Sequence, residues 1–162
     1  MVSLAACSGG ASAGGGSTNS SSAASPSAAP AGPTLGAPFE VKQNDGTAKI
    51  TIVSASYGPA LGGAFDIAPK NGGYLILDVL WETSTGTSSS NPLYIKAKSA
   101  DGREGDIALG VASQLGSGDV PPGDTSRGNV GFDIGAGPYT IVVTDQLLQE
   151  KARLTAVNAS VR

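Results

Sequence analysis

Residues 73–82, in the middle of the chain, constrain the fold more than any other stretch. Successive side chains of a β-strand point to opposite faces, so a strand here places Leu75, Leu77, Val79 and Trp81 on one face. That face is wholly apolar and carries the single tryptophan of the chain, whereas the other face is mixed. A helix would scatter the same side chains around its circumference. We therefore predict a central strand of an all-β domain, with Trp81 near its core.

The charged residues divide the 162-residue chain into a tail and a domain. Residues 1–36 carry no charge, while all ten Lys and Arg and all thirteen Asp and Glu lie from Glu40 onward. The Ala, Ser, Gly and Pro of the tail bury too little apolar area to offset a backbone entropy cost of about 1–2 kcal/mol per residue. We predict a disordered linker over residues 8–37 and one folded domain over residues 38–162.

Alternating apolar rows predict about seven or eight short strands, with turns about every 8–12 residues, which is typical of a β-sandwich. In chain order, the expected strands cover residues 34–43, 47–57, 73–82, 93–98, 107–114, 129–134, 139–143 and 154–157. The apolar row changes sides between Ile52 and Val53, which predicts a β-bulge there. If strands 73–82 and 93–98 form a hairpin, their registers place Asp78 opposite Lys96 or Lys98.

Two connections carry further expectations. Residues 58–72 form a long loop, which either has a function or places its apolar side chains over one end of the core. Residues 145–151 predict a single helical turn with Asp145 as its N-cap.

The amino end contains the chain's only cysteine, in the sequence Leu4-Ala5-Ala6-Cys7. This pattern resembles the lipobox of bacterial lipoproteins, in which the cysteine is acylated and becomes the new N-terminus. The resemblance implies that residues 1–7 are the remnant of a signal peptide and that Cys7 anchors the protein to the membrane. Only six residues precede Cys7 and none is basic, so we expect a longer leader in the natural protein. The alternative is a stray cysteine in a disordered tail.

Four parts of the domain carry a second resemblance: residues 47–57, residues 73–82, residues 100–103, and residues 122–124 together with 128–133. They resemble a domain of unknown function found in lipoproteins of Gram-positive bacteria and actinobacteria. The same layout is similar to a family of small immunogenic proteins secreted by mycobacteria. The resemblance implies an immunoglobulin-like antiparallel β-sandwich and an extracytoplasmic location at the cell envelope. It brings no catalytic residues.

Composition excludes several chemistries. The chain has no histidine, which removes Ser-His-Asp triads and histidine zinc sites, and its one cysteine lies in the lipobox-like segment. The net charge is −3 and no cluster of Lys or Arg occurs, which argues against nucleic-acid binding. Carboxylate pairs such as Glu104 with Asp106, and Asp119 with Asp124, lie in predicted turns. We expect no enzyme activity, no cofactor and no metal.

Two functions of different classes, and a third without a ligand, remain open. The first is a lipid-anchored module that binds a protein or envelope ligand through the outer face of the central strand, formed by Tyr74, Ile76 and Leu80 and flanked by Tyr94. The alternative for this face is that a loop or the C-terminal segment covers it. The second is a hydrolase that acts on envelope polysaccharide with two carboxylates across a cleft. The third is a spacer or immunodominant surface protein without a specific ligand.

Overall fold

The computed structural model describes residues 32–64 and 66–162 of the chain. These residues form eleven strands and one short 3-10 helix, η1. The elements are β1 (Phe39–Lys42), β2 (Gly46–Gly58), β3 (Tyr74–Gly86), β4 (Ser88–Ser90), η1 (Pro92–Tyr94), β5 (Ile95–Lys98), β6 (Asp106–Ala108), β7 (Gly118–Val120), β8 (Thr125–Asp133), β9 (Tyr139–Thr144), β10 (Glu150–Val157) and β11 (Ser160–Val161). Residues 8–31 of the linker predicted over residues 8–37, and the anchor predicted at Cys7, lie outside the described residues.

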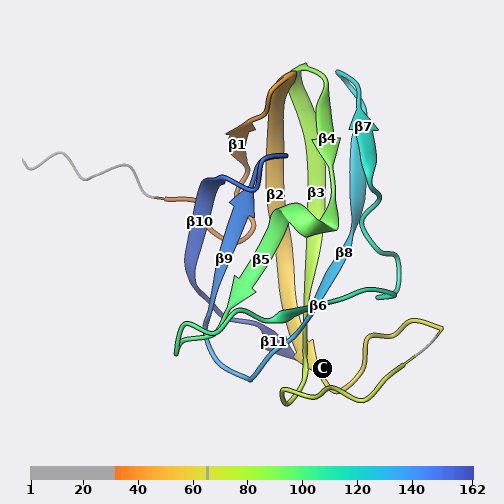
Figure 1. Cartoon of the computed structure of the whole chain (residues 1–162), viewed down its shortest axis with the longest axis vertical. Helices are drawn as coiled ribbons and strands as arrows, with labels where there is room; N and C mark the ends of the chain where they lie inside the picture. The colour runs from red at the N-terminus through yellow and green to blue at the C-terminus, as the bar shows by residue number, and fades with distance from the viewer. Residues whose placement is uncertain (1–31, 65) are drawn as a thin grey trace, which may run out of the picture. The chain divides into compact units, whose positions relative to one another are not determined.

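The strands build an antiparallel β-sandwich, which confirms the predicted fold class (Figure 1). One sheet has the order β1-β2-β3-β8-β6, and the short β11 adds to β2 in parallel. The other sheet has the order β10-β9-β5 and lies across β2 and β3. A third pair, β4 with β7, closes the upper end in Figure 1. The structure has more strands than expected. Several of them contain only two to four residues, too few for an alternating pattern to show in the sequence.

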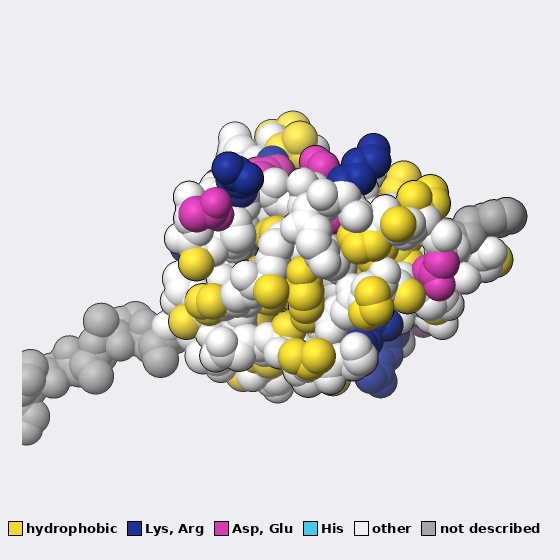
Figure 2. Space-filling view, turned by 90° about the horizontal axis from the view of Figure 1, so that it is seen from below, with side chains coloured by type: hydrophobic (Ala, Val, Ile, Leu, Met, Phe, Trp, Pro, Cys, Tyr) yellow, Lys and Arg dark blue, Asp and Glu magenta, His cyan; other side chains and the backbone are white. Residues whose placement is uncertain are grey.

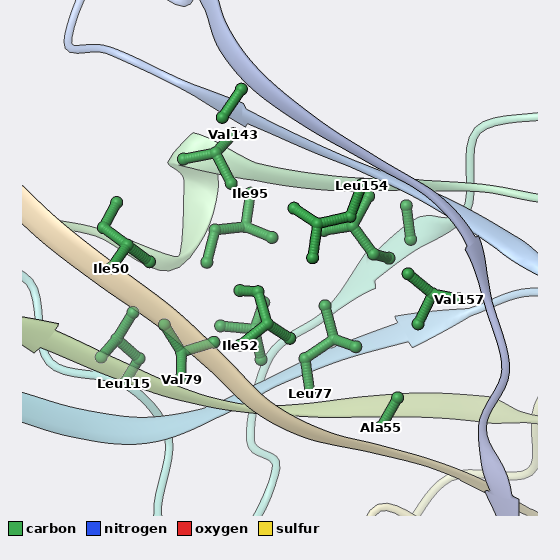
Figure 3. Packing of buried hydrophobic residues seen from close by; sticks show 14 of the residues in the cluster. Ile50, Ile52, Ala55, Leu77, Val79, Ile95, Leu115, Val143, Leu154 and Val157 are labelled. Carbon is green, nitrogen blue, oxygen red and sulfur yellow. The ribbon is translucent and has the colours of Figure 1, made fainter. Parts of the chain in front are cut away.

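The core lies between the two sheets, where the predicted apolar rows meet (Figure 3). Leu75, Leu77, Val79 and Trp81 of β3 are all 0 % exposed, as the alternation predicted. The opposite wall includes the inward row of β9, which is also fully buried. Its members are Tyr139, Ile141 and Val143. Burial of apolar area at about 25 cal/mol per Å² is the main force that holds the sheets together.

Strand β2 contains the predicted bulge. Ile52 pairs with Val79, whereas Ser54 pairs with the next residue, Asp78, so Val53 is the extra residue. The bulge keeps Ile50 and Ala55 buried on the same face although their spacing is odd.

The polar edge of Trp81 is satisfied inside the core. Its indole N–H donates to the Ser88 hydroxyl over 2.9 Å. The Ser88 and Thr83 hydroxyl oxygens lie 2.6 Å apart, and Thr83 donates to the backbone oxygen of Val120 over 2.6 Å. Each group in this chain of hydrogen bonds thus has a partner, as buried polar groups require. The chain joins β3 to the β4–β7 pair.

The predicted hairpin between strands 73–82 and 93–98 is wrong. Strand β3 lies between β2 and β8, and β5 belongs to the other sheet. Asp78 therefore pairs with Arg127 of β8, through two hydrogen bonds of 3.1 and 2.7 Å. Lys96 pairs instead with Glu104, at 3.1 Å. The reason is the connection: β4 and η1 stand between the two strands and lead the chain across to the second sheet.

The predicted helical turn at residues 145–151 is also wrong. Asp145 does cap a turn, because its carboxylate accepts from the backbone N–H groups of Leu147 (2.9 Å) and Gln149 (3.0 Å). Leu148, however, has a φ of 58°, in the left-handed region, which reverses the chain and starts β10 at Glu150.

Two expected strands are shorter in the structure. The strand expected over residues 34–43 begins at Phe39, because Gly36 lies in a turn with a φ of 79°. The amide of Gly36 donates to the backbone oxygen of Ile52 over 2.8 Å, so residues 34–37 lie against β2. The strand expected over residues 107–114 is reduced to Asp106–Ala108.

Candidate functional site

The loop over residues 58–72 covers half of the predicted binding face. Tyr74 and Ile76 are only 4 % and 7 % exposed, since they pack with Leu61 of this loop and Val111 of another. The Tyr74 hydroxyl donates to the backbone oxygen of Ile67 over 2.9 Å, which ties the loop down. At these two residues, therefore, a loop covers the predicted binding face, which is the alternative considered above. The loop lies on the outer face of the β1-β2-β3-β8-β6 sheet.

The structure does not bring the other two residues of that face together. Leu80 is half-buried on the outer face of β3, between Thr51 and Arg127 on the neighbouring strands. Tyr94 ends η1 and packs against Trp81 at the core, with the ring centroids 6.5 Å apart. Tyr94 does not flank the predicted face, because the strand that follows it, β5, belongs to the second sheet. Partner binding at these residues stays a prediction.

A cleft with a volume of about 600 Å³ lies at the lower end of the sandwich. Figure 2 views this end, where hydrophobic side chains gather in the middle and charged side chains lie toward the margins. Three segments form the cleft: residues 70–71, residues 99–106, and residues 133–136 after β8. Sequence reasoning placed the acidic residues of this region in separate turns and did not predict that they share one cleft.

Asp133, the last residue of β8, fixes one wall of the cleft. Its side chain is 8 % exposed, and its two carboxylate oxygens accept from the backbone N–H groups of Lys70 (2.7 Å) and Asn71 (2.9 Å). A carboxylate with two backbone donors satisfies loop amides that have no strand partner. No local sequence pattern distinguishes Asp133 from a solvated aspartate at the end of a strand.

Asn71 connects the carboxylates of two adjacent strands. Asp106 of β6 and Asp133 of β8 are directly paired residues, and the Asn71 side chain donates to an Asp106 carboxylate oxygen over 3.3 Å. The same amide donates to the backbone oxygen of Asp133 over 3.4 Å. Asp106 is itself exposed, so its carboxylate faces the cleft and solvent.

Two further acidic side chains at the cleft have close partners. Glu104 pairs with Lys96, while Asp101 accepts from the Ser99 hydroxyl and lies 3.6 Å from Arg103. The Ser99 hydroxyl, and then the backbone of Arg103, lower the pKa of Asp101. The cleft thus has fixed polar walls with a net negative charge, which suits recognition of a polar ligand. Among the described residues, no group of three His, Cys, Asp or Glu side chains is placed to hold a metal ion.

Asp133→Asn is expected to lower the free energy of unfolding by about 1–3 kcal/mol, because the amide retains one acceptor and turns an NH₂ group toward a backbone donor. Urea denaturation measures the loss, and hydrogen exchange at the amides of Lys70 and Asn71 locates it. Asp124→Asn, in an exposed turn, is the matched control. Equal stability of the two variants would show that Asp133 does not hold the loop.

Known proteins resemble this chain in structure and not in sequence. No family model matches the sequence, and no curated protein matches it. The structure of MPT63, a secreted protein from Mycobacterium tuberculosis, is similar with a TM-score of 0.62 and 16 % identity, over 80 % of this chain and 99 % of MPT63. A putative lipoprotein (ycdA) from Bacillus subtilis is similar with a TM-score of 0.55 and 14 % identity, over 74 % of this chain and 39 % of that one.

What these proteins share with this chain is the fold. At such identities the likeness shows a common β-sandwich, and it matches the architecture that the sequence resemblance implied. Among the residues that the structure describes, no helix is long and apolar enough to cross a membrane.

Proposed function

We propose that this protein is a non-catalytic binding module on the outer side of the cell membrane, anchored through an acylated Cys7. The Leu4-Ala5-Ala6-Cys7 pattern supports the anchor, and so does the fold, which occurs in a secreted protein and in part of a putative lipoprotein. An uncharged linker between the cysteine and the sandwich holds the domain away from the membrane. Two acyl chains, or one chain and a second signal, give a stable attachment.

The observation that carries the binding function is the cleft between residues 70–71, 99–106 and 133–136. The Asp133 carboxylate holds the backbone of Lys70 and Asn71 in place at one wall of the cleft. The cleft is therefore formed before a ligand binds, and binding costs little conformational entropy. Its exposed acceptors, Asp106 among them, favour a ligand rich in hydrogen-bond donors. An envelope polysaccharide, with its many hydroxyl groups, fits that description.

Co-sedimentation of the full-length protein with purified cell-wall polysaccharide tests this proposal. The double variant Asn71→Ala/Asp106→Ala is expected to weaken the affinity at least about fivefold, which corresponds to the loss of one hydrogen bond of about 1 kcal/mol. Asp119→Ala, an acidic residue at the opposite end of the sandwich, is expected to bind as the original protein does. Equal binding by all three proteins would remove the cleft from the proposal.

The anchor has its own test. Palmitate labelling of the full-length gene product in a lipoprotein-forming bacterium is expected to mark the protein, and Cys7→Ala is expected to abolish the label and release the protein from the membrane fraction. A labelled Cys7→Ala variant, or an unlabelled original protein, would contradict the anchor at this residue.

A polysaccharide hydrolase is the alternative, because Asp101, Glu104, Asp106 and Asp133 all line the one cleft. Such a reaction needs one carboxyl group as acid and a second as base or nucleophile. The partners of Asp101, Glu104 and Asp133 favour binding instead, since each of these carboxylates is already engaged. Soluble sugar released in the sedimentation assay, and lost in Asp106→Asn, would support hydrolysis.

A further inference from the structure

The turn between β9 and β10, residues 145–149, presents two leucines to solvent, and we call it the leucine turn. Leu147 and Leu148 are 63 % and 58 % exposed, and they are the only consecutive pair among the large exposed hydrophobic side chains of the described residues. Leu93 of η1, also exposed, lies at the same end of the second sheet, because the Thr144 hydroxyl donates to the backbone oxygen of Tyr94 over 3.1 Å. Exposed apolar side chains that gather in one place mark interaction sites, whereas single ones need no explanation.

The backbone of Leu148 has a conformation that does not suit its side chain. Its φ of 58° lies in the left-handed region, which glycine and asparagine adopt far more readily than leucine. The turn needs this conformation to reverse the chain, but it does not need a leucine to do so. Most of the side chain is exposed, so packing within the domain does not account for it either. Residues in such conformations cluster at functional sites, which points to a partner outside the domain.

Hydrogen bonds hold the leucine turn in one shape. The Asp145 carboxylate accepts from the backbone N–H groups of Leu147 (2.9 Å) and Gln149 (3.0 Å). The backbone N–H of Asp145 donates to the oxygen of Gln149, and the backbone N–H of Leu148 donates to the oxygen of Asp145, each over 3.0 Å. The two leucines are therefore displayed on a preformed turn, and a partner binds them at little cost in conformational entropy.

The charges beside the leucines are balanced. The Lys151 ammonium lies 3.0 Å from the buried Asp145 carboxylate, and the Arg153 guanidinium donates two hydrogen bonds of 2.7 and 2.6 Å to the Glu150 carboxylate. Because a cation neutralises each of these two carboxylates, they do not repel an anionic surface. Leucines flanked by long basic side chains are typical of protein segments that lie at the surface of a bilayer.

The chain from the predicted anchor enters the domain beside β10, the strand that follows the leucine turn (Figure 1). A Cβ atom at Gly32, the first described residue, would lie 4.0 Å from the backbone oxygen of Arg153. Arg153 follows Leu148 by five positions, so at about 3.3 Å per residue the two lie within about 17 Å of each other. Residues 8–31, between Cys7 and this point, span at most about 3.3–3.6 Å each, a length that allows the turn to reach the bilayer.

We propose that the leucine turn inserts Leu147 and Leu148 into the surface of the membrane to which Cys7 anchors the protein. The inference rests on the proposed anchor, because two leucines alone give a weak and reversible attachment, as a single acyl chain does. An anchor keeps the turn at a high local concentration near the bilayer, which makes so weak a contact effective.

The contact gives the domain an orientation. Strand β9 runs from Tyr139, shortly after the cleft residues 133–136, to Thr144, directly before the leucine turn. At about 3.3 Å per residue, its six residues separate the two ends by about 17–20 Å. With the leucines at the bilayer, the cleft therefore faces away from the membrane, toward the proposed polysaccharide ligand.

Quenching of tryptophan fluorescence by brominated lipid tests the contact. The full-length protein is coupled through its single cysteine, Cys7, to a maleimide lipid in vesicles of phosphatidylglycerol and brominated phosphatidylcholine. Leu147→Trp is expected to be quenched, whereas Trp81 is fully buried and gives the same background in every variant. Val161→Trp, at an exposed site at the cleft end of the sandwich, is the matched control and is expected to keep its fluorescence. Adding Leu148→Asp to Leu147→Trp is expected to lower the ratio of inserted to free turns at least about fivefold, since one leucine no longer leaves water.

Two results would overturn the proposal. Equal quenching of Leu147→Trp and Val161→Trp would show that the anchored domain has no preferred end at the membrane. A dimer of the free protein that Leu148→Asp dissociates would assign the leucines to a second copy of the chain. The lipid is coupled chemically, so either result is independent of whether a cell acylates Cys7, which the palmitate labelling decides.

Leu148→Gly separates membrane contact from folding. It is expected to reduce the quenching of Leu147→Trp as Leu148→Asp does. Its melting temperature is expected to stay the same or rise by up to about 4 °C, because glycine adopts a φ of 58° without strain. A lower melting temperature would show that the leucine stabilises the domain itself, and would contradict its assignment to the membrane.

Discussion

Trp81→Ala is expected to lower the free energy of unfolding by about 3–5 kcal/mol, the usual cost of removing a large buried aromatic side chain. Trp81 is 0 % exposed, packs against Tyr94 and donates its indole N–H to Ser88. The substitution leaves a cavity between the sheets and an unpaired acceptor in a buried chain of hydroxyl groups. Chemical denaturation followed by circular dichroism measures the loss.

Two further variants separate packing from hydrogen bonding at this position. Trp81→Phe keeps an aromatic ring and removes the N–H, so we expect a smaller loss of about 1–3 kcal/mol. Leu93→Ala, at a side chain that is 53 % exposed, is expected to change stability by no more than about 0.5 kcal/mol. If Trp81→Ala were as stable as Leu93→Ala, Trp81 would not belong to the core.

Gly128→Ala is expected to destabilise the domain by about 3 kcal/mol, at the upper end of the cost of overpacking. Gly128 lies in the middle of β8, opposite Val79 of β3. A Cβ atom at this position would lie 2.5 Å from both the Cα and the amide nitrogen of Leu115, which are backbone atoms and cannot rotate away. The segment at Leu115 must then move, and its buried side chain leaves the core.

Gly116→Ala provides the matched control, because the same methyl group is added one residue after Leu115. The nearest atom to its Cβ is the Ser126 hydroxyl oxygen at 3.8 Å, an ordinary contact. We expect a change within about 0.5 kcal/mol. Similar stability of the two alanine variants, measured by thermal and urea unfolding, would contradict the close approach of Leu115 to β8.

Local patterns predicted those parts of the fold that depend on neighbouring residues. Alternation placed Leu75, Leu77, Val79 and Trp81 inside, and the change of parity at Ile52 and Val53 located the bulge. The period of a strand fixes which side chains share a face, whatever the strand pairs with. The same reasoning failed at residues 145–151, because one left-handed residue, Leu148, is enough to reverse a chain that an aspartate cap has started.

The candidate sites depended on contacts that alternation does not encode. Asp133 ends a strand, as many solvated aspartates do, and it is buried only because the loop at Lys70 and Asn71 donates two backbone N–H groups to its carboxylate. Tyr74 and Ile76 were expected on an outer face, where Leu61 and its loop cover them. A loop of that length carries no periodic signal that shows which face it crosses.

The sequence by itself determined an all-β sandwich, the inward face of its central strand and the place of the bulge, because each follows from the period of two and from the residues within a few positions. The tertiary structure alone decided that β5 pairs in the other sheet and not with β3, and that four acidic residues share one cleft. These features arise between residues far apart in the chain. Their geometry is fixed only when the sheets pack, since no local stretch contains both partners.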